Sequence, residues 1–159
     1  MTHRTSAKNT RCVQWTIELR TPGVLQKARN EMQSGLHCLK VKCHECCHET
    51  EMPLSLADIK RLKSLGYKTS EFMTITHGER RLRNVAGKCY FLTDNGCKVY
   101  PDRPKGCKFY PLVVDSSGQA MIDKQCKHHQ NHNIKPGNPA KLHIYLKLLK
   151  RERRREKTQ

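Results

Sequence analysis

Hydrophobic residues recur with a clear period in only a few stretches of the chain. Between residues 56 and 65 they lie three positions apart, which is typical of an amphipathic helix. Ser55 precedes this stretch as an N-cap, Asp58 completes a pair resembling a capping box, and Gly66 ends the helix. The pattern predicts a core helix, with further core residues at Phe72 and Met73 and an apolar face made of Leu56, Ile59, Leu62 and Leu65.

Apolar stretches on either side of turn residues predict two β-hairpins. The apolar residues 112–114 and 120–122 flank the polar turn 115–119, and this hairpin would bring Cys126 back toward Cys107. The other hairpin would join residues 89–93 to 97–100.

In that second hairpin we expect a three-residue loop, 94–96, with Gly96 left-handed in a G1 bulge. Cys89 and Cys97 would then share a sheet face but lie about 13 Å apart, at ~3.3 Å per residue. Either there are two metal sites, or the hairpin is irregular.

The chain divides into three predicted parts: an N-terminal adjunct (1–35), a cysteine-cluster domain (36–134) and a basic C-terminal helix or tail (135–159). In the adjunct, alternating apolar residues from Val13 to Leu19 predict a half-buried strand, and Thr21-Pro22 begins a short helix that ends near Gly35. In the last part, a narrow apolar stripe is formed by Leu142, Tyr145, Leu146 and Leu149.

Composition adds that the hydrophobic core is thin. The chain has 159 residues, about one domain's worth, and 36% of them are hydrophobic, below the roughly 45–50% of ordinary globular domains. We therefore expect a small, irregular, cysteine-rich α+β domain stabilised by metal. No apolar run approaches the ~18 residues of a membrane span, and the N-terminus lacks a secretory signal, so we expect a cytoplasmic protein.

The nine cysteines are the candidate chemistry. In a reducing compartment, clustered cysteines more often bind metal or do redox work than form disulfides, and an odd number argues against a closed disulfide framework. Cys43 and Cys46 form a C-x-x-C pair, with Cys38 upstream and Cys47 adjacent. Neighbouring residues of an extended chain point to opposite sides, so we expect one of Cys46 and Cys47 to bind the main metal and the other to serve a second site or an outer shell.

The later cysteines include a ten-residue echo, in which the Gly-Cys-Lys and Tyr-Pro of residues 96–101 recur in residues 106–111. Two similar turns would each deliver a thiolate to a common centre; a chance echo is the alternative. The eight candidate metal ligands are Cys38, Cys43, Cys46, Cys47, Cys89, Cys97, Cys107 and Cys126.

This order of cysteines, with the stretch Gly96-Cys97-Lys98-Val99-Tyr100-x-x-Arg103-Pro104-x-x-Cys107-x-x-x-Pro111, resembles the YkgJ-type cysteine-cluster family, also called CxxCxxCC or the zinc- or iron-chelating domain. The resemblance covers roughly residues 36 to 130. Four residues separate Cys38 from Cys43, which departs from a strict C-x-x-C, and Cys12 lies outside the pattern. The resemblance implies a metal-binding domain without an established reaction, distantly related to the flagellin lysine methylase FliB.

Thiolates favour zinc or iron–sulfur clusters over hard cations. Eight could fill two four-cysteine zinc sites, or four could hold one iron–sulfur cluster, of the 4Fe-4S type. The irregular spacing favours iron–sulfur. Arg103 would act in an outer shell, offsetting thiolate charge, or would anchor its turn. The neighbouring histidines, most of them solvated or in an outer shell, are His37, His44, His48, His128, His129 and His132.

Charge suggests other functions. The formal net charge is +17, and residues 141–159 hold eight Lys or Arg and two Glu. Such a field attracts polyanions, so the alternative function is an RNA- or ribosome-associated module with a structural zinc; anionic membrane is a weaker option because the apolar stripe is narrow. A further alternative, by analogy with FliB alone, is a metal-dependent enzyme resembling protein methyltransferases.

Overall fold

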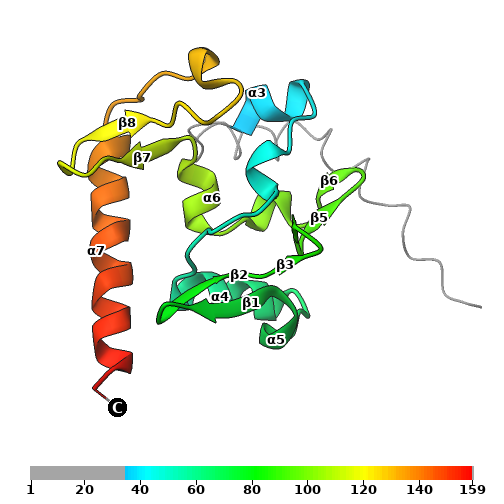
Figure 1. Cartoon of the computed structure of the whole chain (residues 1–159), viewed down its shortest axis with the longest axis vertical. Coiled ribbons are helices and arrows are strands. Elements are labelled where there is room, and N and C mark those ends of the chain that lie inside the picture. Colours follow the sequence, from blue (N-terminus) through cyan, green and yellow to red (C-terminus); the bar gives the residue numbers. More distant parts are fainter. Residues whose placement is uncertain (1–34, 159) are drawn as a thin grey trace, which may run out of the picture.

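The computed structural model describes residues 35–158, which form short helices and four two-stranded antiparallel sheets (Figure 1). The helices are α3 (Gly35–Lys40), η1 (Glu45–Cys47), α4 (Leu56–Ser64), α5 (Thr69–Phe72), η2 (Tyr100–Asp102), α6 (Lys105–Phe109), η3 (His129–Asn131) and α7 (Asn138–Glu156). The strands are β1 (Met73–Thr76), β2 (Glu79–Leu82), β3 (Asn84–Val85), β4 (Lys88–Cys89), β5 (Leu92–Thr93), β6 (Gly96–Cys97), β7 (Leu112–Val114) and β8 (Ala120–Ile122). Cys12 and the predicted strand and helix of the adjunct lie outside the described residues.

The predicted core helix is α4, and its capping box is confirmed. The Ser55 hydroxyl accepts from the Asp58 amide, and the Asp58 carboxylate accepts from the Ser55 amide. Leu62 is buried and Ile59 packs against the core, but Leu56 and Leu65 are exposed. The prediction of a single inward apolar face was therefore wrong at both ends, because only the middle of this short helix faces the core.

Two small clusters of buried side chains make up the core of the described residues. The first lies around α4, α5 and the strands between residues 73 and 99, and consists of Leu54, Leu62, Phe72, Leu82, Cys89, Phe91 and Val99. The second joins α6, β7 and α7 through Phe109, Leu112, Leu142 and Tyr145. Each cluster is too small to organise a long sheet, in agreement with the thin core expected from composition.

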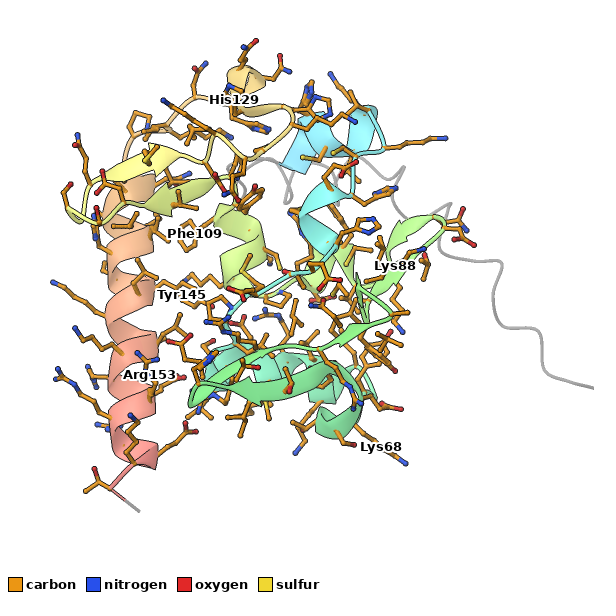
Figure 2. The ribbon with its side chains drawn as sticks, viewed as in Figure 1. Lys68, Lys88, Phe109, His129, Tyr145 and Arg153 are labelled. Atoms are coloured by element: carbon orange, nitrogen blue, oxygen red, sulfur yellow. The ribbon has the colours of Figure 1, made fainter. Side chains whose placement is uncertain are left out.

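Helix α7 runs along one side of the molecule, with β7 and β8 beside its N-terminal part (Figure 1). The apolar stripe is confirmed: Leu142 and Tyr145 are buried and Leu149 packs against them, while Leu146 is more exposed. Tyr145 projects into the body near Phe109 (Figure 2), and its hydroxyl donates to the Pro53 carbonyl and the Asp58 carboxylate. The helix thus packs against the cysteine domain.

The hairpin predicted at residues 112–122 is confirmed as β7 paired with β8, with Val113 opposite Met121. The one predicted at residues 89–100 is irregular. Thr93 pairs with Gly96 and Leu92 with Cys97, so the loop holds two residues, although Gly96 has the expected positive φ of 97°.

Cys89 belongs to a different ladder, where it pairs with Asn84. The chain changes partners between Tyr90, whose amide donates to Arg83, and Phe91, whose carbonyl accepts from Lys98. Because the ladder breaks there, the separation of about 13 Å expected at ~3.3 Å per residue along one ladder does not apply.

The described residues therefore form the small, irregular α+β domain that the sequence predicted. None of the helices within residues 35–158 is long and apolar enough to cross a bilayer.

Candidate metal centre

One cavity of about 390 Å³ is lined both by the cysteines between residues 38 and 47 and by the later ones between residues 89 and 126. Its lining includes all eight predicted ligands: Cys38, Cys43, Cys46, Cys47, Cys89, Cys97, Cys107 and Cys126. Each of these eight is a free thiol, and they come from helices, strands and turns far apart in the sequence. The fold thus brings together the side chains that the spacing singled out, while their role as ligands stays a prediction.

The cysteines between residues 38 and 47 reach the cavity through two short helical turns. Cys38 lies on α3, and the amide of Cys43 donates to the Cys38 carbonyl at 3.0 Å, so the chain turns back after the helix. Cys46 and Cys47 lie on η1. A 3-10 helix rotates about 120° per residue, less than the half turn of an extended chain, and this is why both neighbours line one cavity.

Three of the later cysteines arrive on regular elements: Cys89 on β4, Cys97 on β6 and Cys107 on α6. Cys126 follows β8 in a turn closed by its amide, which donates to the Asp123 carbonyl. The expectation of two similar turns at the echo was wrong, because residues 96–101 form a strand and a 3-10 turn whereas residues 105–109 form an α-helix. Both halves nevertheless deliver a cysteine to the same cavity.

Two tyrosines of the echo also line the cavity, and sequence reasoning treated them only as stops before proline. Tyr100 and Tyr110 stand at matching places in the two halves. Burial raises the pKa of Tyr100 to about 12 and raises that of Tyr110 as well. Both phenols therefore stay protonated at neutral pH. The Tyr110 hydroxyl bonds to the Asp123 carboxylate, so Tyr100 is the phenol that can donate to a thiolate. The echo itself was the signal that could have identified them.

Arg103 lies at the cavity wall, largely buried, with its guanidinium carbon 3.9 Å from the centre of the Tyr100 ring. Its carbonyl accepts from the Arg61 guanidinium at 2.9 Å. Its positive charge lowers the pKa of Cys46, Cys97 and Cys107, opposing the effect of burial. The outer-shell role of Arg103 stays a prediction, and its carbonyl contact with Arg61 holds its turn.

Burial is the main influence on most of these thiols. Desolvation raises the pKa of Cys38 to about 11 and that of Cys97 to about 11, and raises that of Cys107 further. Cys46 differs, because a hydrogen bond from the Cys47 thiol lowers its pKa to about 7 and raises that of Cys47. A metal binds the deprotonated thiolate form of cysteine. A cation in this cavity would therefore offset the cost of ionising these buried thiols.

The neighbouring histidines fall into two groups. His44 and His48 line the cavity with the cysteines. His37 contacts both His128 and His132 beside it, with ring centres 5.0 Å apart for His37 and His128 and 5.8 Å for His37 and His132. His129, labelled in Figure 2, has its Nδ1 3.0 Å from the Cys126 carbonyl oxygen.

The donor chemistry of the cavity suits a thiophilic metal, because it combines soft sulfur ligands with a positive side chain nearby. Within residues 35–158, no group of three His, Cys, Asp or Glu side chains is arranged to hold a metal ion as it stands. Binding would therefore require the thiols to rotate toward the ion. The cavity therefore fits a thiophilic metal through the kind of side chains that line it and through the space that they share.

Comparison with known protein families matches residues 37–136, more than half of the chain, to the family CxxCxxCC, described as "Putative zinc- or iron-chelating domain". No curated protein and no solved structure matches the chain significantly. The matched segment holds all eight cysteines of the cavity. The chain therefore belongs to the CxxCxxCC family and is a metal-binding cysteine-cluster protein.

Proposed function

We propose that thiolates of the shared cavity hold an iron–sulfur cluster of the 4Fe-4S type. The observation that carries this proposal is the convergence of eight cysteines on one cavity of about 390 Å³. Two independent zinc sites would each be compact, tetrahedral and closed by four ligands. A single cavity shared by the early thiols (residues 38–47) and the later ones (residues 89–126) favours one centre with several metal atoms.

The residues around the cavity suit a cluster in three ways. The buried walls supplied by Phe91 and Val99 limit access of water. The Arg103 charge offsets thiolate charge, and the Tyr100 hydroxyl can donate to sulfur. When bound, such a cluster supplies one-electron transfer at a potential set by these surroundings. The remaining thiols would serve as neighbours of the four ligands.

The test is chemical analysis of full-length protein purified without oxygen. We expect iron and acid-labile sulfide in equal amounts, near four of each per chain, with zinc well below one equivalent. Zinc without sulfide would overturn the cluster and support zinc in the same cavity. Protein that folds well without metal would contradict both.

Single Cys→Ser variants identify the ligands. A 4Fe-4S cluster uses four cysteines, so we expect four of the eight substitutions to remove most of the iron and the other four to weaken its retention. Cys12→Ser is the matched control, because Cys12 lies outside the segment matched by the family, and it should leave the iron content unchanged. Equal loss of iron in all eight variants would contradict a single four-ligand cluster.

We also infer a second function, binding of RNA through α7. The specific observation is how this helix distributes its charges. Its two carboxylates, Glu152 and Glu156, both pair with Arg80 of β2, and Arg153 pairs with Glu79. The exposed basic residues of the helix and its C-cap are Lys141, Lys147, Lys150, Arg151, Arg154, Arg155 and Lys157. The exposed surface is thus more basic than the helix sequence as a whole.

Point substitutions are the appropriate test, because removing residues 141–159 would also remove the buried Leu142 and Tyr145. Lys147→Glu, Arg151→Glu and Arg154→Glu together should weaken binding of single-stranded RNA. They should reduce the slope of log affinity against log salt by about 0.7 for each phosphate that is no longer bound. Lys60→Glu with Lys63→Glu, on exposed positions of α4, is the control. If the α7 and α4 variants bind RNA equally weakly, the effect comes from net charge alone, which would contradict a specific role for α7.

A further inference from the structure

Three histidines from two segments of the chain lie beside the thiol cavity. His37 lies on α3, and His128 and His132 flank the 3-10 turn η3. The His37 ring is the common member, with its centre 5.0 Å from that of His128 and 5.8 Å from that of His132. The spacing of His128 and His132, with three residues between them, is one that zinc sites use.

His132 shows that this meeting is not a surface accident. Its side chain is only 7% exposed, and its Nε2 atom has no hydrogen-bond partner among the described residues. A buried polar atom without a partner costs about 1–3 kcal/mol. A ligand that accepts the lone pair of this nitrogen would remove that cost.

The two ring distances from His37 are close to those expected around a tetrahedral ion. Zinc binds imidazole nitrogen at about 2.0–2.1 Å, which puts the ring centre about 3.2 Å from the ion and two such centres roughly 5 Å apart. As they stand, no three His, Cys, Asp or Glu side chains within residues 35–158 are arranged to hold a metal ion, so these imidazoles would have to reorient to bind one. The Asn131 amide nitrogen lies 3.3 Å from His37 Nε2, and an ion bound to that nitrogen would replace this contact. Rotation of the His37 ring, or withdrawal of this exposed amide, opens the site.

We propose that His37, His128 and His132 form a second metal site, separate from the thiol cavity, for a divalent transition-metal ion of the zinc type. Three neutral imidazoles leave the fourth position of a tetrahedral ion for water or a small anion. Neutral nitrogen donors suit Zn²⁺, Cu²⁺ and Ni²⁺, in contrast to the thiolates next door. The ion would join α3 to the segment around η3.

Cobalt distinguishes the two sites in the full-length protein. Thiolate-bound Co²⁺ gives an intense sulfur-to-metal charge-transfer band in the near ultraviolet, whereas imidazole-bound Co²⁺ gives only visible d–d absorption. In a titration of the protein as purified, we expect one equivalent that adds d–d absorption without adding to the charge-transfer band. Zn²⁺ added afterwards should displace this equivalent.

His37→Gln and His128→Gln are the test variants, because both side chains are partly exposed and their loss leaves the buried His132 in place. Each should weaken the thiolate-free equivalent by more than the roughly 10–100-fold that losing an outer-shell partner costs. His143→Gln, on α7, is the control and should bind cobalt as the unmodified protein does. The charge-transfer band should be the same in all three variants, which separates this result from any failure of the cluster proposal.

Two outcomes would overturn the proposal: no thiolate-free equivalent in the unmodified protein, or one that persists in both test variants. The His132 imidazole provides a measurement that needs no variant. Its ¹⁵N chemical shifts should move on addition of Zn²⁺ in the unmodified protein. Unchanged shifts at saturating Zn²⁺ would contradict the site even if both variants failed to fold.

Discussion

Arg103 is the residue whose charge most directly affects the thiol cavity. Its guanidinium stacks on Tyr100, and its charge opposes the rise in pKa that burial causes at Cys97 and Cys107. A buried positive charge beside several thiolates favours their ionised, metal-binding form. Lys127 also lines the cavity, but its side chain is 69% exposed, so water screens its charge.

We predict that Arg103→Met weakens metal retention by about 10–100-fold, as loss of an outer-shell partner does in other metal sites. Lys127→Met, the matched control, should retain metal nearly as well as the unmodified protein. The measurement is the rate of metal loss to an excess of chelator. Similar rates in the two variants would mean that Arg103 only anchors its turn.

Asp58 connects three elements of the fold. This carboxylate is 1% exposed and accepts hydrogen bonds from the Ser55 hydroxyl, the Arg61 guanidinium, the Lys105 amide and the Tyr145 hydroxyl. It therefore caps α4 while holding α6 and α7 against it. The sequence identified only the capping role, because the Lys105 and Tyr145 donors lie far away along the chain.

Asp58→Asn replaces one acceptor oxygen by a donor and leaves at least one of these groups unpaired. We predict a loss of at least about 2 kcal/mol in the free energy of unfolding, measured by urea denaturation of the metal-loaded protein. Asp94→Asn, in the exposed turn between β5 and β6, should change it by less than about 0.5 kcal/mol. Equal stability of the two variants would show that the Asp58 contacts contribute little.

At the scale of elements, ion pairs hold the C-terminal half of α7 against β2. The Arg80 side chain is 8% exposed and pairs with Glu152 at 2.8 Å and with Glu156. Arg153 of the helix, labelled in Figure 2, pairs with Glu79. Glu152 also accepts from the amide of Leu56 at the start of α4. A largely buried arginine between two carboxylates is far less screened than a surface pair.

Arg80→Met should therefore destabilise the protein by about 3 kcal/mol, because it leaves the largely buried Glu152 without its cation. The effect should be local at first, with faster amide hydrogen exchange in residues 150–156 than in residues 142–149. Arg154→Met, at an exposed position of the same helix, is the control. Uniform exchange along α7 in the Arg80 variant would mean that the apolar stripe alone holds the helix.

The sequence predicted those elements whose stabilising contacts come from residues close together in the chain. The α4 capping box and the β7–β8 hairpin each follow from residues close together in the chain, and both were predicted. The ladder break between Tyr90 and Phe91 depends on Arg83 and Lys98 as partners, and no turn signal marks it. The cysteines that share the cavity could be identified from their spacing even where the backbone is irregular, whereas the strands that carry them could not; their role as ligands stays a prediction.

At the scale of the whole molecule, the thiol cavity lies against the first core cluster. Cys89 belongs to that cluster, and Cys47, Cys97 and Cys107 pack against it. The sheets have only two strands each, and short strand pairs are marginal without a partner surface. Metal bound by cysteines that sit in the core would therefore stabilise that core directly.

Removing the metal should consequently unfold the molecule unevenly. We predict that chelation under reducing conditions lowers the melting temperature and broadens the transition. Amide protection should be lost first near Phe91 and Val99, in the first cluster, and later near Leu142 and Tyr145, in the second. The second cluster packs through α6, β7 and α7, and of these only α6 carries a cysteine. Restoring the metal should recover protection in the first cluster.

A metal-free protein with unchanged melting and exchange would show that the apolar contacts suffice, and that the cysteines serve the chemistry of the site without supporting the fold.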